Sequence, residues 1–121
     1  MFTTDESKSH AGMPTGVNPG ELHVVVSGAE QAYEIHLLGE LDMSTAPALR
    51  ERLLGLAGDG PTHVTIDLSA LSFVDSTGLS VLITGLKRIR QQGGDMALRS
   101  PTPATRRVLE ITGLTEVFSI S

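Results

Sequence analysis

Two kinds of hydrophobic pattern alternate along the chain from Glu21 onward. Short runs rich in valine, isoleucine and leucine are typical of β-strands, whereas apolar residues at every third or fourth position are typical of amphipathic helices. The β-type runs are ELHVVVS (21–27), AYEIHLLG (32–39), THVTIDLS (62–69), DMALRS (95–100) and VFSIS (117–121). Helical segments separate the last four runs, and this alternation predicts an α/β domain.

The connections between the runs predict how the strands pair. The four residues GAEQ (28–31) between the first two runs fit a hairpin, so these two strands are expected to be antiparallel. The later strands are joined through helices and are expected to pair mostly in parallel. The sequence therefore predicts a mixed β-sheet of four to five strands flanked by helices.

The first predicted helix begins at Thr45, a residue type that caps helices, and has Pro47 in its first turn. It stops at GDGP (58–61), because glycine and proline interrupt the helical hydrogen-bond pattern. Its expected apolar face consists of Ala46, Leu49, Leu53 and Leu56.

Two further helices are expected, one on each side of the DMALRS run. The earlier one is predicted to end at Gly93 and Gly94, and the later one to run from Thr102 and Pro103 to Gly113. The apolar face of the earlier helix is expected to hold Leu79, Leu82, Ile83, Leu86 and Ile89, and the later helix is expected to carry Val108, Leu109 and Ile111.

The first twenty residues differ in composition from the rest. They mix serine, threonine, glycine, proline and charged residues without any periodicity, so they have too little apolar surface to repay the entropy of folding. Residues 1–20 are therefore expected to form a flexible tail, and residues 21–121 a single domain. The tail lacks the apolar segment and cleavage site of a secretory signal.

Composition and charge exclude several classes of function. Nine basic against fourteen acidic residues give a formal net charge of −5, which argues against binding to nucleic acid. No cysteine is present, so disulfides and thiolate metal sites are excluded. No apolar run approaches the roughly 20 residues that a membrane span needs. The expected location is the cytoplasm, with no membrane association.

The stretch FVDSTGLSVLI (73–83) places Asp75, Ser76 and Thr77 between a strand-like segment and an apolar helix. The amides of the first helical turn have no partner within the helix. A hydroxyl or carboxylate at this position can cap the helix, and a hydroxyl there can also act as a nucleophile or carry a phosphate. Capping by Asp75 or Ser76 accounts for part of this pattern but leaves Thr77 unexplained.

Catalytic interpretations of the same stretch are weak. None of the four histidines lies where it would activate a serine, and VDSTG lacks the first glycine of a nucleophile elbow. The aspartic protease signature and the nucleotide-binding P-loop are also missing. Asp42, Asp67 and Asp75 could meet at strand ends as a phospho-acceptor or Mg²⁺ site, although each is equally explained as a loop acid or helix cap. The chain is expected not to be an enzyme and to hold no cofactor or metal.

Two segments, GELDMSTAPAL from Gly39 and IDLSALSFVDSTGLSVLI from Ile66, resemble the STAS domain of anti-sigma factor antagonists. The C-terminal residues Gly113, Leu114 and Phe118 are also similar to that family. The resemblance implies a single STAS domain. It also implies that Ser76, the serine that follows Asp75 in the D-S-[ST]-G pattern, is the phosphorylation site.

The same resemblance implies a partner-switching role. The unphosphorylated domain would bind an anti-sigma factor with serine kinase activity and so release a sigma factor for transcription. Phosphorylation of Ser76 would end this binding, and a serine phosphatase would restore it. The residues expected to bind the partner or to be recognised by the kinase are Asp42, Asp75, Ser76, Thr77, Gly78 and Ser80.

Two other functions remain compatible with the expected fold. The domain could serve a pathway without a sigma factor, as part of a stress-signalling scaffold or as a transporter regulator. It could also be a nucleotide-binding sensor in which Asp42 and Asp67 place the ligand. Within the site, Thr77 is a possible minor phosphate acceptor, and Thr84 accompanies Ser80 on the outer face of the helix.

Overall fold

The computed structural model describes residues 17–58 and 60–121. The strands are β1 (Leu22–Ala29), β2 (Ala32–Leu41), β3 (His63–Val74), β4 (Asp95–Arg99) and β5 (Ser119–Ile120). The helices are α1 (Ala46–Leu56), α2 (Ser76–Gln91) and α3 (Pro103–Ile111), followed by the 3₁₀ turn η2 (Leu114–Glu116). Most of the predicted tail, residues 1–16, lies outside the described residues. Of its last residues, Gly20 donates its amide to Glu40 Oε2 (3.0 Å).

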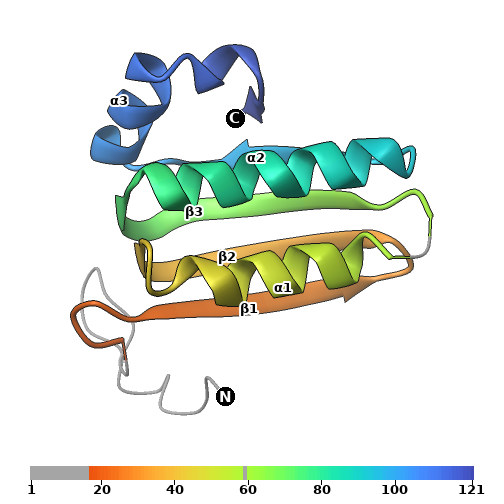
Figure 1. Ribbon diagram of the computed structural model, residues 1–121, viewed down its shortest axis with the longest axis horizontal. Coiled ribbons are helices and arrows are strands. Elements are labelled where there is room, and N and C mark those ends of the chain that lie inside the picture. Colours follow the sequence, from red (N-terminus) through yellow and green to blue (C-terminus); the bar gives the residue numbers. More distant parts are fainter. Residues whose placement is uncertain (1–16, 59) are drawn as a thin grey trace.

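The five strands form one mixed sheet in the order β1-β2-β3-β4-β5, so each strand lies beside its predecessor in the chain (Figure 1). β1 and β2 are antiparallel, and the other pairs are parallel. The hairpin turn consists of Glu30 and Gln31, both with positive φ (56° and 73°), as a two-residue turn between twisted strands requires. The predicted α/β class and mixed pairing are confirmed.

β3 is longer than the run THVTIDLS that predicted it. It stays paired with β2 as far as Val74 across two irregularities, each of which inserts one extra residue in β3, after Asp67 and after Leu71. At the second irregularity the Ser72 hydroxyl donates a hydrogen bond to the carbonyl of Gly39 (3.0 Å). The bulges interrupt the strict alternation of apolar residues, which explains why the sequence pattern ended this strand too early.

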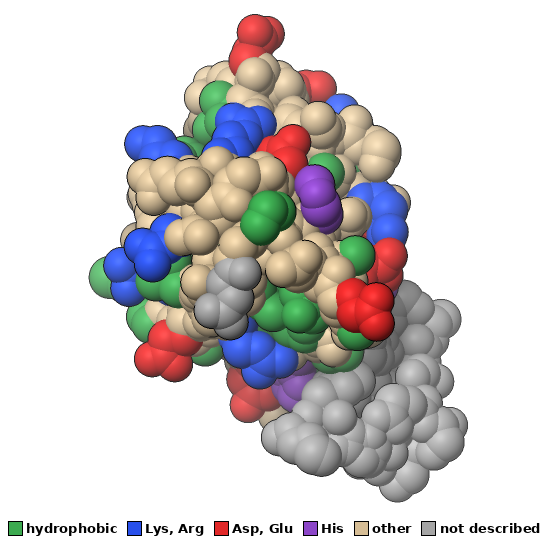
Figure 2. Space-filling view, turned by 90° about the vertical axis from the view of Figure 1, so that its right-hand side faces the viewer, with side chains coloured by type: hydrophobic (Ala, Val, Ile, Leu, Met, Phe, Trp, Pro, Cys, Tyr) green, Lys and Arg blue, Asp and Glu red, His purple; other side chains and the backbone are tan. Residues whose placement is uncertain are grey.

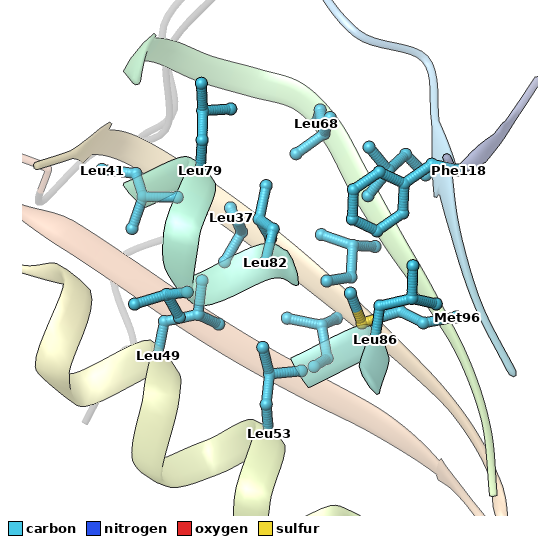
Figure 3. Packing of buried hydrophobic residues seen from close by; sticks show 14 of the residues in the cluster. Leu37, Leu41, Leu49, Leu53, Leu68, Leu79, Leu82, Leu86, Met96 and Phe118 are labelled. Carbon is cyan, nitrogen blue, oxygen red and sulfur yellow. The ribbon is translucent and has the colours of Figure 1, made fainter. Parts of the chain in front are cut away.

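The helices α1 and α2 lie side by side over one face of the sheet (Figure 1). The core between them is almost entirely aliphatic, with Leu49 and Leu53 of α1 facing Leu82 and Leu86 of α2 above the sheet (Figure 3). The apolar faces predicted for α1 and α2 are confirmed except at Leu56 and Ile83, which are only partly buried. On α3 Leu109 is buried, but Ile111 is exposed. None of the helices in the described part of the chain is long and apolar enough to cross a lipid bilayer.

Charged residues on the other face of the sheet form a small ionic cluster across three strands. Arg99 on β4 binds Glu34 Oε2 on β2 (2.8 Å) and Asp67 Oδ2 on β3 (2.9 Å). The hydrogen bond from Arg99, followed by one from His36, lowers the pKa of Glu34 to about 2. Burial opposes ionisation of Asp67, but hydrogen bonds from Ser69 and Arg99 outweigh it and lower the pKa of that carboxyl.

We expect the ion pair of Glu34 to make the stability of the fold sensitive to acid. Because the folded-state pKa of Glu34 is about 2, below its ordinary value of 4.5, its contribution is present above about pH 4.5 and is lost as the pH falls towards 2. The melting temperature of Glu34→Gln should therefore fall less steeply than that of the wild type over this range. Melting curves recorded between about pH 2 and 7 would measure the difference.

The matched control is Glu110→Gln. Glu110 is exposed on α3, and no ion pair joins it to another described residue. Its acid profile should follow the wild type, and parallel profiles for Glu34→Gln and the wild type would contradict the prediction.

Candidate functional site

The segment FVDSTGLSVLI (73–83) spans the end of β3 and the beginning of α2. At this end of the sheet, where β2 and β3 have their carboxyl ends, the Asp75 amide donates to the carbonyl of Leu41 (3.1 Å), the last residue of β2. The loops that follow β2 and β3 therefore emerge side by side. The parallel pairing of these two strands, with Leu41 opposite Val74, brings the loops that carry Asp42 and Ser76 to the same end of the sheet, as expected for the carboxyl ends of parallel strands.

Asp75 is the N-cap of α2. Its backbone is extended (φ −111°, ψ −176°), and Oδ1 accepts the amide hydrogen of Gly78 (2.9 Å). The second oxygen, Oδ2, accepts the amide hydrogen of Met43 from the other loop (3.2 Å). One carboxylate thus caps the helix and joins the two loops, which decides between the two capping residues that the sequence allowed.

Ser76 is the first residue of α2, and its side chain is exposed. Asp75 supplies the cap, and the Ser76 hydroxyl has no hydrogen-bond partner among the described residues. The amides of Ser76 and Thr77 also have no acceptor there, as is usual in the first turn of a helix. The site therefore offers an accessible hydroxyl beside two amides that favour a negative charge.

Asp42 organises its own loop. Its Oδ1 accepts hydrogen bonds from the Ser44 hydroxyl (2.8 Å), the Ser44 amide (3.0 Å) and the Thr45 amide (3.1 Å). The bond from the Ser44 hydroxyl is the main cause of the lowered pKa of Asp42. Thr45 occupies the N-cap position of α1 as predicted, but its side chain makes no capping bond and instead donates to the carbonyl of Glu40 (2.9 Å).

The remaining predicted site residues differ in burial. Gly78 is buried against Leu41, and a Cβ at this position would lie 2.6 Å from Leu41 Cγ. Leu79 packs in the core next to Leu41, as the predicted apolar face required (Figure 3). Thr77 is half-buried, whereas Ser80 is exposed one turn after Ser76. Gly78 therefore sets how closely α2 approaches the sheet, and Ser80 extends the accessible surface.

Asp42, Asp67 and Asp75 do not converge on one site. Asp67 lies within β3 opposite His36 and is engaged by Arg99 and Ser69, away from the strand end. Across residues 17–58 and 60–121, no three histidine, aspartate or glutamate side chains are grouped so that they could hold a metal ion. The structure therefore gives no support to the Mg²⁺ or nucleotide site that these three acids suggested.

The fold and sequence match known proteins over most of the chain. The STAS domain model matches residues 23–121. The anti-sigma-B factor antagonist of Bacillus subtilis (strain 168) is 36% identical over 100 residues, covering 83% of this chain and 91% of that protein. The corresponding protein of Staphylococcus aureus (strain NCTC 8325 / PS 47) is 30% identical and covers 83% and 93%.

A solved structure shows the same relationship. The crystal structure of an anti-sigma factor antagonist from Mycobacterium paratuberculosis has 32% sequence identity and a TM-score of 0.76, covering 86% of this chain and 88% of that one. The chain therefore belongs to the STAS domain family and, within it, to the anti-sigma factor antagonists.

Proposed function

We propose that this anti-sigma factor antagonist is controlled by phosphorylation of Ser76. In the unphosphorylated state it binds an anti-sigma factor with serine kinase activity, and the sigma factor is set free. The kinase then transfers the γ-phosphoryl group of ATP to Ser76 Oγ, which loses its proton, and ADP leaves. A serine phosphatase hydrolyses the phosphate ester and restores the binding form. ATP belongs to the kinase in this scheme, and the antagonist holds no cofactor.

One observation carries the proposal: Ser76 is exposed at the start of α2 while Asp75 performs the capping. A phosphate on Ser76 therefore breaks no capping bond. It adds about −1.5 to −2 charges beside the free amides of Ser76 and Thr77, which tolerate an anion. The fold is expected to persist, whereas a partner surface that fits a neutral hydroxyl meets added bulk and charge beside the Asp75 carboxylate.

The other site residues receive supporting roles in this proposal. Asp75 fixes the position of Ser76 and is the acidic neighbour that the kinase recognises. Asp42 shapes the adjacent loop of the partner surface, and Gly78 sets the depth of the helix start. Ser80 lies one turn further along the exposed side of α2 and contributes to the same surface.

We expect the kinase to modify Ser76 and not Thr77. The purified chain would be incubated with ATP and the anti-sigma factor kinase of its source organism, and the modified residue identified by tandem mass spectrometry. Ser76→Ala should abolish incorporation of phosphate. Thr77→Ala is the matched control and should remain a substrate, since the half-buried Thr77 side chain is less accessible to the kinase. Phosphate on Thr77, or on Ser76→Ala protein, would contradict the assignment.

A further inference from the structure

Large hydrophobic side chains are exposed at only a few places in the described part of the chain. Four of them stand out: Met43 (73% exposed), Phe73 (49%), Ile111 (72%) and Val117 (39%). Met43 and Phe73 belong to the two segments that form the Ser76 site. An exposed apolar residue by itself needs no explanation, whereas exposed apolar residues that lie together mark an interaction surface.

The structure places Met43 and Phe73 at the same end of the sheet, where β2 and β3 have their carboxyl ends. Phe73 is the second-last residue of β3 and lies opposite Glu40 of β2. Met43 follows the end of β2 by two residues, and its amide is held by Asp75 Oδ2 (3.2 Å). Because Asp75 also caps the helix that starts with Ser76, one carboxylate positions Met43 and the phosphorylation site relative to each other.

A shallow pocket of about 100 Å³ adjoins Phe73. It is lined by Ser72, Phe73, Val74, Ala104, Thr105 and Val108, so α3 forms its second wall. Pockets for cofactors and other small molecules are roughly 300–1,000 Å³. This one is too small for such a ligand and has room for a single aliphatic side chain.

The charges on the two loops at the site have one sign, whereas α3, on the other side of the pocket beside Phe73, carries Arg106 and Arg107. Residues 40–49 and 73–86 include Glu40, Asp42 and Asp75 but no lysine or arginine. The first cation after Ser76 on α2 is Lys87, about 16 Å further along the helix at 1.5 Å per residue. The opposite end of the molecule carries interspersed acidic, basic and hydrophobic side chains (Figure 2). Apolar side chains next to acidic loops are complementary to apolar side chains bordered by lysine or arginine.

We infer that Met43 and Phe73 are the apolar anchors through which this chain binds its anti-sigma factor. The inference rests on the proposed function and adds the chemistry of the contact. The anti-sigma factor presents an aliphatic side chain to the pocket beside Phe73, a second apolar group to Met43, and cations to Asp42 and Asp75. The anchors supply affinity in either state of Ser76, while the phosphate supplies the repulsion that ends binding.

The test compares substitutions of exposed hydrophobic residues inside and outside the proposed contact. Met43→Ser and Phe73→Ser should each weaken binding of the purified anti-sigma factor from the source organism by about tenfold or more, the usual effect of losing an interface anchor. Ile111→Ser is the matched control, because Ile111 is 72% exposed but does not line the pocket beside Phe73, and the affinity of this variant should be that of the wild type. The melting temperature of Met43→Ser should equal that of the wild type, which would show that its loss of affinity does not reflect unfolding.

The outcomes separate this inference from the proposed function. If Ser76→Asp abolishes binding while Met43→Ser and Phe73→Ser bind normally, the switch stands and the anchors are wrong. A wild-type chain that does not bind the anti-sigma factor contradicts both. If the substitutions instead dissociate a dimer of the chain in analytical ultracentrifugation and leave the affinity unchanged, the surface accommodates a second copy and the inference fails. Equal weakening by Ile111→Ser also overturns it.

Discussion

Replacement of Ser76 by aspartate is expected to lower the affinity for the anti-sigma factor by about 100-fold or more without lowering stability. An unpaired charge enclosed in a protein interface typically costs 2–5 kcal/mol of binding free energy, and about 2.7 kcal/mol corresponds to 100-fold. In the free protein the same carboxylate lies beside the unpaired amides of the first turn of α2, where a negative charge is favourable. Isothermal titration calorimetry and thermal melting would measure the two effects separately.

Ser76→Ala is the matched variant, and it should bind the anti-sigma factor equally well with ADP or ATP. The Ser76 hydroxyl has no hydrogen-bond partner among the described residues, and the capping bond comes from Asp75, so its removal should change the melting temperature little. Wild-type binding should decline with time once ATP is supplied. A Ser76→Ala protein whose binding also declines with ATP would show that another residue carries the switch.

The largest change in stability is expected for Gly94→Ala. A Cβ at Gly94 would lie 1.9 Å from the backbone oxygen and 2.6 Å from the backbone nitrogen of Thr62, and no side-chain rotation can relieve a clash with backbone. The strand pair β3–β4 would have to separate at its first residues. We expect a loss of about 3 kcal/mol in the free energy of unfolding, at the upper end for an overpacked site, measured by urea denaturation.

Gly55→Ala provides the opposite control. Gly55 lies in the last turn of α1 with nothing within 4 Å of the position of a Cβ. Alanine there should stabilise the protein by up to about 1 kcal/mol, because it reduces the entropy of the unfolded chain. A Gly94→Ala protein as stable as the wild type would mean that β3 and β4 approach each other less closely than described.

The fold was predictable where periodicity is strong, as along α2, and less so where backbone geometry dominates. The end of the second helix illustrates both. Gly93 and Gly94 were expected to stop it, and they do, through bonds from their amides to the carbonyls of Arg90 and Ile89. The positive φ of Gly93 (88°) is a local property, whereas the contact of Gly94 with Thr62 depends on the packing of the sheet. Only the first is encoded in neighbouring residues.

The candidate site was predictable in its residues but not in its bonds. The sequence indicated Asp75 and Ser76 at the start of a helix. Which of them caps the helix depends on the extended backbone of Asp75, which only the structure shows. The bond between Met43 and Asp75 joins residues 32 positions apart, which no local pattern reports. Met43 directly after Asp42 and Phe73 two residues before Asp75 were the available signals for the apolar surface, and sequence reasoning missed both.

The expectation of a protein without catalytic activity agrees with its family. Anti-sigma factor antagonists are regulators rather than enzymes. The nucleotide-sensor alternative also loses one of its two residues, because Asp67 belongs to the ionic cluster with Arg99 and Glu34 on the face of the sheet opposite α1 and α2.

The order of the strands in the sheet has a consequence for synthesis of the chain. Each strand lies beside the one translated just before it, so a segment leaving the ribosome can add to a sheet that is already formed. The β1–β2 hairpin offers the first template, and each helix and strand that follow extend it by one unit. The bond from Arg99 to Glu34, 65 residues apart, must wait until β4 is in place. Folding can therefore keep pace with translation, and a newly made strand does not stay unpaired and exposed until a distant segment has been synthesised.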